Sequence, residues 1–391
     1  MRALFVALLI AIATTPTPPQ RAAFITTLGR DTVVVESYTR TDKHMDGYIV
    51  VRIPGTVLCH YAVDLAKDGS VTHTDLDIKP LGTSDVHGGR VSLDFANGEV
   101  RITGDTPTGS QSATHDFKPG GFPFFMTGFG SSYGLYSSLG MYELFLPRVL
   151  SAPKDTTSVQ SIDIASARPV TRQFVRHSPT QVDVDYFGIG WTQLTLDASG
   201  QITSANADRT TEKVQSQRTD YIDVERLAKT FATADHAGKG IGVASPNKVA
   251  KGSIGGTPVT VTFGSPQKRG RDILGNVVKY DRVWRTGANE ATTIAFSRDV
   301  AVGGQAVPAG TYSLWTMPAK DGTVQLIVNR QHGQWGTDYD SSQDLTHVPM
   351  HVATAATPAE NFTIDVTGAD NAAELRMSWD TFVWTVPITA K

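Results

Sequence analysis

Side chains that could bind a negatively charged group are densest between residues 269 and 290. A guanidinium presents a planar fork of N–H donors that matches the two oxygens of a carboxylate. Two or three arginines of this stretch, with Asn289 and Tyr312 nearby, could therefore hold a carboxylate or a sugar acid. The candidate residues are Arg269, Arg271, Arg282, Trp284, Arg285, Asn289, Glu290 and Tyr312.

The same cluster also has a structural interpretation. Arg282 and Arg285 could pair with neighbouring carboxylates and stack on Trp284, which would pin the loop. The carboxylates concerned are those of Asp281 and Glu290. Both uses are ordinary in a β-sandwich, and we favour the structural one.

A serine motif indicates a different chemistry. Gly130-Ser131-Ser132-Tyr133-Gly134 matches the G-x-S-x-G turn, in which a strand before and a helix after expose a nucleophilic serine. The rest of the chain lacks the strand–helix alternation that would supply the acid and the histidine from neighbouring loops. A Ser132 nucleophile is therefore the minor alternative to an aromatic-rich loop.

Acidic residues near position 340 have the alternating spacing of oxygen ligands in a calcium loop. Gln343 stands where such a loop needs glycine, and Pro349 stands where a bidentate glutamate would close it, so an EF-hand is excluded. An irregular calcium site remains an alternative to a polar loop whose aspartates cap turns. The candidate ligands are Asp338, Asp340 and Asp344.

His347 and His351 could share one face of a strand, but no third zinc ligand lies near them in the sequence. We therefore expect neither a metal nor a cofactor.

An aromatic-rich stretch lies between residues 122 and 145. Its second half has helical spacing, and we expect this helix to lie across the concave face of a sheet. The aromatics exceed what one strand face needs, so they could wall a lipophilic cavity. A helix that only fills the space explains them too, and we favour it. The candidates for the cavity are Phe124, Phe125, Tyr136 and Tyr142.

The elements around the arginine cluster follow a strand period. Thr292, Ile294 and Phe296 alternate with smaller residues, which is typical of a strand with one buried face. Gly303-Gly304 then predicts a tight hairpin, because glycine adopts positive φ without steric cost. A further strand, Thr311–Met317, completes an antiparallel meander.

Two segments of this region closely resemble the bacterial "domain of unknown function 2911" family. They are Tyr280–Thr292 and Pro308–Leu314, with further matches at Lys268–Arg271, Asn329, Gln334-Trp335-Gly336 and Tyr339-Asp340. The resemblance covers roughly residues 244–388. It implies an exported β-rich domain and supplies no reaction and no catalytic residues.

The first half of the chain also has a β rhythm, with hairpin signatures at Asp68-Gly69 and Asn97-Gly98. Tyr61–Thr74 and Thr192–Ala205 each follow the order strand, glycine-containing turn, strand, which indicates a duplicated, curved sheet. The pattern loosely resembles the half-barrel domains of lipoprotein-carrier type in exported bacterial proteins.

The N-terminus is typical of a secretory signal, because Arg2 precedes an apolar run that ends in Ala11-Ile12-Ala13. A retained N-terminal anchor is the alternative. No other segment is apolar over the roughly 20 residues that a membrane-spanning helix needs. The single cysteine, Cys59, excludes an intramolecular disulfide, and we expect a buried hydrophobe rather than a reactive thiol.

A chain of 391 residues is long enough for two domains. We expect a mainly β, two-domain protein, in which a curved antiparallel sheet or half-barrel with a covering helix is followed by a β-sandwich. The expected segments are a signal peptide at 1–13, a proline-rich leader at 14–22, an N-terminal β domain at 23–236 with helices near 132–146 and 221–235, a glycine-rich linker at 237–256 and a C-terminal β-sandwich at 257–391.

The net charge of −3 gives no reason to expect nucleic acid as a partner. We expect a periplasmic or secreted, non-enzymatic protein that binds a lipophilic or saccharide ligand or interacts at the cell envelope. The alternative is a secreted hydrolase that uses Ser132, or Arg269 and Arg285 on an acidic substrate. The ligand and the oligomeric state stay open.

Overall fold

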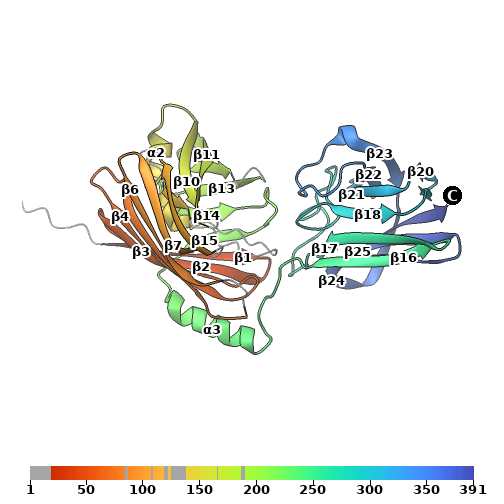
Figure 1. Ribbon diagram of the computed structural model, residues 1–391, viewed down its shortest axis with the longest axis horizontal. Helices are drawn as coiled ribbons and strands as arrows, with labels where there is room; N and C mark the ends of the chain where they lie inside the picture. Colours follow the sequence, from red (N-terminus) through yellow and green to blue (C-terminus); the bar gives the residue numbers. More distant parts are fainter. Residues whose placement is uncertain are drawn as a thin grey trace, which may run out of the picture.

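The structure is a computed structural model, and it describes residues 19–83, 87–106, 109–118, 122–124, 138–164, 166–185 and 190–391. These residues form two β units joined by the connection 237–246 (Figure 1). The signal segment and most of the leader lie outside the described residues, as do Phe125, Ser132 and Tyr136. Of Phe124 only the backbone is described.

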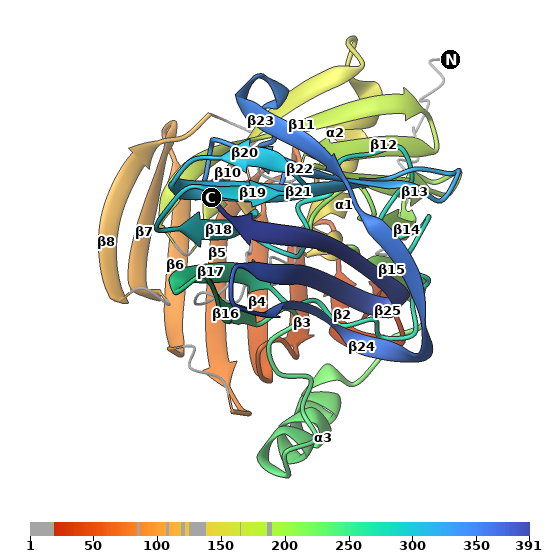
Figure 2. The ribbon, with the colours of Figure 1, turned by 90° about the vertical axis from the view of Figure 1, so that its right-hand side faces the viewer.

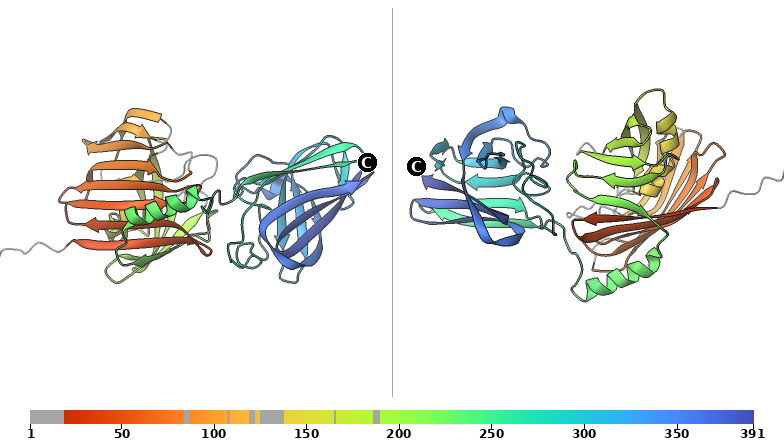
Figure 3. Two further views of the ribbon diagram at one scale, coloured as in Figure 1. Left: turned by 90° about the horizontal axis from the view of Figure 1, so that it is seen from below. Right: turned by 180° about the vertical axis from the view of Figure 1, so that it is seen from behind.

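The described strands of the N-terminal unit form one strongly curved sheet of 15 strands (Figures 1 and 3). They are β1 (Gln20–Leu28), β2 (Asp31–Arg40), β3 (His44–Val51), β4 (Val57–Leu65), β5 (Val71–Pro80), β6 (Gly89–Ala96), β7 (Glu99–Thr106), β8 (Gly109–Asp116), β9 (Phe122–Phe124), β10 (Thr156–Asp163), β11 (Arg168–Ser178), β12 (Gln181–Asp185), β13 (Trp191–Leu196), β14 (Ile202–Asn206) and β15 (Gln215–Thr219).

The strand order in this sheet is β8 to β1, followed by β15 down to β9. β1 and β15 pair antiparallel, with Ala23 opposite Thr219, so the two halves of the unit join at their first and last strands. The short β9 pairs with β10 in parallel. The mainly β, antiparallel fold class is thereby confirmed.

The two faces of the sheet are covered differently. Successive side chains of a strand point to opposite faces. Val34 of β2 belongs to the core that includes α1 (Leu139–Glu143) and α2 (Leu146–Ser151). Val35 packs on the other face with side chains of α3 (Val224–His236), which crosses the outside of the sheet (Figures 1 and 3).

Buried carboxylates attach α1 to the sheet. Glu36 of β2 accepts hydrogen bonds from the Tyr61 hydroxyl at 2.7 Å and from the Leu139 amide at 2.9 Å. Glu143 pairs with Arg218 at 2.7 Å. Burial raises the pKa of Glu36, although these hydrogen bonds oppose the rise. A short helix is therefore held by satisfied polar groups as well as by apolar packing.

The helices differ in detail from the predicted ones. In the described part of the range 132–146, α1 ends at Glu143, and a second helix, α2, starts at Leu146 with Pro147 in its first turn. Proline has no amide hydrogen, so it fits a first turn and not a helix interior. α3 begins after Asp223, which caps it by accepting a hydrogen bond from the Arg226 amide. No described helix is long and apolar enough to span a membrane.

The linker is shorter than predicted. Residues Asn247–Ile254 form strand β16, which pairs with β17 (Thr257–Gly264). Gly255 and Gly256 have φ values of 57° and 75° and make the turn between these strands. Glycines counted as linker residues thus serve a hairpin, whose primed turn requires positive φ at both central positions.

The C-terminal unit is a sandwich of two sheets (Figure 2). One sheet has the order β16-β17-β18-β21-β22-β23, and the other has the order β20-β19-β25-β24. The remaining elements are β18 (Thr292–Phe296), β19 (Val300–Val302), β20 (Gln305–Val307), β21 (Gly310–Pro318), β22 (Val324–Asn329), the short 3-10 helix η1 (Ser341–Gln343), β23 (Asp344–Pro349), β24 (His351–Ala369) and β25 (Ala372–Ala390).

Candidate functional site

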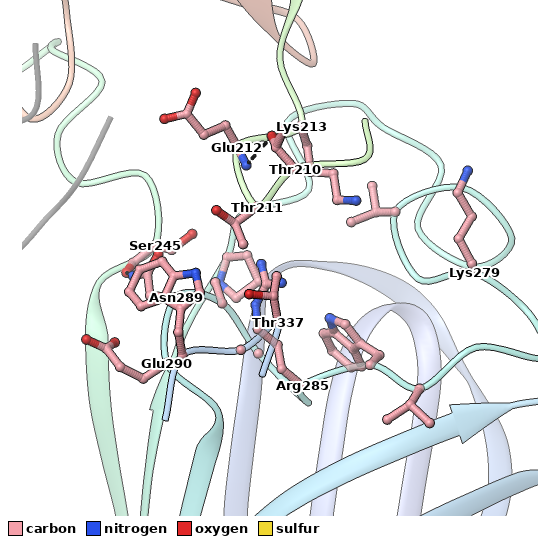
Figure 4. A pocket seen from close by; sticks show the side chains of 18 of the residues that line it. Thr210, Thr211, Glu212, Lys213, Ser245, Lys279, Arg285, Asn289, Glu290 and Thr337 are labelled. Atoms are coloured by element: carbon pink, nitrogen blue, oxygen red, sulfur yellow. Dashed lines mark hydrogen bonds between the residues drawn. The ribbon is translucent and has the colours of Figure 1, made fainter. Parts of the chain in front are cut away.

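A pocket of about 740 Å³ lies between the two β units (Figure 4). The N-terminal unit contributes residues 209–213, which connect β14 to β15. The sandwich contributes residues from the β17–β18 connection and from the β22–β23 connection. Among the aromatic residues that border it, Trp335 and Tyr339 are partly exposed, whereas Trp284, Trp315 and Trp379 are buried in the sandwich.

The loop that carries the arginines is anchored in the sandwich core through Trp284. Its backbone exchanges two hydrogen bonds with Thr316, at 2.8 and 2.9 Å. Its indole stacks on Trp379 with a centroid distance of 6.1 Å and an interplanar angle of 17°. Large aromatic surfaces packed in this way restrict the motion of the chain that carries them.

The same loop contains strained backbone. Thr286 and Asn289 have φ values of 55° and 63°, and such values are outliers for a β-branched residue like threonine. The Thr286 carbonyl accepts a hydrogen bond from the Thr292 hydroxyl at 2.7 Å, which helps to hold the conformation. Backbone strain of this kind gathers at ligand-binding segments.

Arg285 is the most unusual residue of the wall. Its side chain makes no hydrogen bond and no ion pair with any residue that the structure describes, and its Nε is buried. Burial lowers the pKa of Arg285 to about 10, and the guanidinium therefore stays charged at neutral pH. The arrangement leaves a positive charge facing the cavity, and no carboxylate of the described residues forms an ion pair with it.

The predicted ion pairs of this cluster were wrong. Among the described ion pairs, none includes Arg282 or Arg285. Trp284 contacts Phe362 and two other tryptophans rather than a guanidinium in the described ring contacts. The indole of Trp284 packs inward on the sandwich core, whereas the side chain of Arg285 faces the pocket.

Lys213 approaches the pocket from the N-terminal unit. Its amine donates to the carbonyl oxygen of Asp208 and has no carboxylate partner among the described residues. Burial, and then the positive charge of Arg285, lower the pKa of Lys213 to about 8. A lysine whose pKa is lowered by a neighbouring arginine indicates that cations from both units face one space.

Arg271 completes the cationic side of the wall. Its guanidinium donates to the carbonyl oxygens of Lys268 at 3.1 Å and Gln267 at 2.6 Å. These two backbone hydrogen bonds fix the orientation of the guanidinium. Burial, and then the charge of Arg269, lower the pKa of Arg271 to about 10. The wall holds more positive charge than its own carboxylates can balance.

The structure brings most of the predicted cluster together. The predicted residues that line the pocket are Arg271, Arg282, Trp284, Arg285, Asn289 and Glu290. Arg269 lies elsewhere, since it is 3% exposed and pairs with Asp31 of the N-terminal unit. Tyr312 also lies off the wall, on β21, where its hydroxyl donates to the Pro308 carbonyl at 3.0 Å.

The aromatic candidates of the N-terminal unit do not join this pocket. Tyr142 is buried in α1 and meets Phe174 edge-on at 5.8 Å. Phe124 belongs to β9, at one end of the strand order of the sheet. The proposed serine nucleophile, Ser132, falls outside the described residues, as do Phe125 and Tyr136.

The acidic residues near position 340 have local partners. Asp340 accepts from the Ser342 amide at 2.9 Å and caps η1. Asp344 accepts from the Tyr339 hydroxyl at 2.6 Å and from Asn329 at 2.8 Å. Asp338 is exposed, and no group of metal-binding side chains was found among the described residues.

Sequence reasoning missed the wall contributed by the N-terminal unit, together with Lys279 and Trp315. The segment Arg209–Lys213 is a polar turn between two strands, and nothing local distinguishes it from other turns of the chain. Trp335 had been noted in the family resemblance without a role. Docking of the two units brings Arg209–Lys213 to the loop of Arg285, whereas Lys279, Trp315 and Trp335 reach the pocket through the fold of the sandwich itself.

Residues 245–388 match the model of a family described as "Protein of unknown function (DUF2911)", which confirms the resemblance of the C-terminal third. No curated protein matches the chain. A DUF1089 family protein from Pseudomonas aeruginosa is similar in structure, with 10% identity and a TM-score of 0.31 over 51% of this chain and 95% of that one. A beta-barrel-like protein of DUF1849 from Brucella abortus has 13% identity and a TM-score of 0.34, over 54% and 100% of the two chains.

Proposed function

We propose that the protein is an exported, non-enzymatic binding protein that holds a small ring-bearing ligand in the pocket between its two β units. The observation that carries the proposal is a cavity of about 740 Å³ whose wall includes the partly exposed rings of Trp335 and Tyr339. Ligand pockets are typically of this size, form preferentially between domains and are lined mainly by apolar and aromatic side chains. An aromatic or sugar ring could stack on such a wall.

The wall also supports binding over catalysis. Its described residues include threonines and carboxylates but no histidine or cysteine, the groups that most often activate a nucleophile or act as one. The Arg269 and Arg285 pair that the hydrolase alternative requires is not assembled, because Arg269 is bound to Asp31. Periplasmic or secreted placement follows from the signal-like N-terminus and is part of the proposal.

Titration of the full chain with the neutral fluorescent probe phenylnaphthylamine tests this function. We expect saturable binding, with energy transfer from tryptophan to the probe. Thr337→Trp places a large ring on the exposed rim of the pocket and should abolish the signal. The same change at Thr230, on the exposed side of α3, should leave it intact.

Two results of this titration would contradict the proposed function. Probe binding that is equally strong in Thr337→Trp would place the ligand elsewhere and overturn the proposal. Absence of saturable binding in the unmodified chain would do the same.

A further inference from the structure

We infer that the ligand of this pocket carries an anionic group, a carboxylate or sulfonate on an aromatic body, and that Arg285 binds this group together with Lys213. The inference rests on the proposed function and adds the charge of the ligand and the residues that recognise it.

The first argument is the unpaired guanidinium. Shielding an arginine from water is unfavourable unless a partner compensates for the lost hydration. Arg285 has no such partner among the described residues, and its Nε is shielded from solvent. Arg218, by contrast, is paired with the buried Glu143 at 2.7 Å. An anion in the cavity would supply the missing partner.

The second argument is the convergence of cations from both units. Figure 4 shows Lys213 on one side of the pocket and Arg285 on the other. Lys213 itself has φ of 59°, so it too sits in a strained turn. Two cations that repel each other across a cavity destabilise the protein without a ligand, and an anion between them reverses that effect.

The third argument is the imbalance of charge on the wall. The chain has a net charge of −3, yet the described residues that line this pocket include six cations and two carboxylates. The carboxylates, on Glu212 and Glu290, point away from the centre of the view in Figure 4. Of the cations, Arg209 is neutralised by Asp183. The remaining five are Lys213, Arg271, Lys279, Arg282 and Arg285.

The fourth argument is preorganisation. The stem of Arg285 passes so close to Gly336 that a Cβ there would lie 1.9 Å from its Cδ. The amide of Gly336 donates to the Asn289 carbonyl at 3.0 Å, which ties the two loops together. Holding a guanidinium in place before the ligand arrives reduces the entropy lost on binding.

A matched pair of probes tests the inference on the full chain. Anilinonaphthalene sulfonate carries an anion on nearly the same ring system as the neutral phenylnaphthylamine. We expect Arg285→Met to weaken sulfonate binding by roughly tenfold or more, as expected for loss of a charge-assisted hydrogen bond. Neutral probe binding should stay within about twofold, because methionine keeps the apolar stem of the arginine.

Controls separate this inference from the proposed function. Arg226→Met, on the exposed side of α3, should change neither titration. Arg285→Gln provides a second variant, and thermal unfolding checks that both pocket variants fold. Equal sulfonate affinity in the unmodified chain and a folded Arg285 variant would overturn the inference while leaving the proposed function standing. Failure of both probes to bind the unmodified chain would remove both.

Discussion

At the scale of single residues, the chemistry of the pocket depends on two cations that arrive from different units. Arg285 comes from an anchored loop of the sandwich, and Lys213 comes from a turn of the curved sheet. The low pKa of Lys213, about 8, follows first from burial and then from the charge of Arg285. The charge of Lys213 therefore changes in a pH range that is accessible to binding experiments.

This shift predicts a pH dependence of anion binding. Lys213 is cationic below about pH 8 and neutral above it, so its attraction for an anion is lost as the pH rises through that value. The charged groups that act on it are Arg285, Lys279 and Arg271, which lower its pKa, and Asp208, which raises it. Sulfonate probe affinity should fall severalfold between about pH 7 and about pH 9, as one nearby charge is lost.

The control for this dependence is Lys213→Met, which has no titrating amine. Its probe affinity should be low and nearly constant across the same range, when measured by the same fluorescence titration. A pH dependence identical to that of the unmodified chain would assign the effect to another group.

At the scale of elements, the pocket depends on two loops of the sandwich that fit closely together. The β22–β23 connection pairs with the arginine loop through the bridge between Glu290 and Trp335. At Gly336 the Arg285 stem occupies the space that a side chain would need. The glycine is needed for space rather than for an unusual backbone angle.

Gly336→Ala should therefore damage the site directly. The new Cβ would lie 1.9 Å from Arg285 Cδ and 2.5 Å from the Asn289 carbonyl oxygen. We expect a loss of about 1–3 kcal/mol of stability, as for overpacking elsewhere, with clearly weaker sulfonate binding. Chemical denaturation and probe titration of the full chain measure the two effects.

Gly333→Ala is the comparison in the same connection. Gly333 has φ of 80° but no atom within 4 Å of an added Cβ. It should cost about 1 kcal/mol through backbone strain alone and leave probe binding unchanged. Equal effects of the two substitutions on binding would show that the contact with Arg285 is unimportant.

At the scale of the whole molecule, the two units dock through a buried contact beside the pocket. Arg269 pairs with Asp31, and its carbonyl accepts from the Arg30 amide at 2.9 Å. Gly29 approaches so closely that an added Cβ would lie 2.2 Å from the Arg269 carbonyl oxygen. The arginine predicted as a ligand group thus holds the units together and leaves recognition to its neighbours.

The sandwich has its own core, so we predict that a fragment of residues 244–391 folds alone. The buried members of that core all lie between Ile254 and Ile388. The fragment should show a cooperative thermal transition, yet bind the sulfonate probe roughly tenfold more weakly, because the wall with Lys213 is missing. A fragment without a cooperative transition would argue for one shared core. Undiminished affinity would show that the N-terminal wall does not contribute.

The sequence by itself determined what depends on neighbouring residues. Alternation such as Thr292, Ile294 and Phe296 indicated strands, and the pair Gly303-Gly304 indicated a hairpin, because strand period and turn conformation are local properties. The family resemblance and the density of arginines also pointed to the loop that lines the pocket. Local patterns were insufficient for Gly255-Gly256, which were predicted to be linker residues and instead form a hairpin turn. Glycine is common in both flexible linkers and tight turns, so its presence does not distinguish them.

Tertiary structure alone decided which charges meet. Arg285 has acidic neighbours in the sequence, yet the inward packing of Trp284 leaves its guanidinium facing a cavity instead of a carboxylate. Arg269 is close to it in sequence and is buried against Asp31. Lys213 is far from both arginines in the sequence, yet it lines the same pocket as Arg285. Charge pairing depends on distance in space and on burial, and docking of the two units sets both.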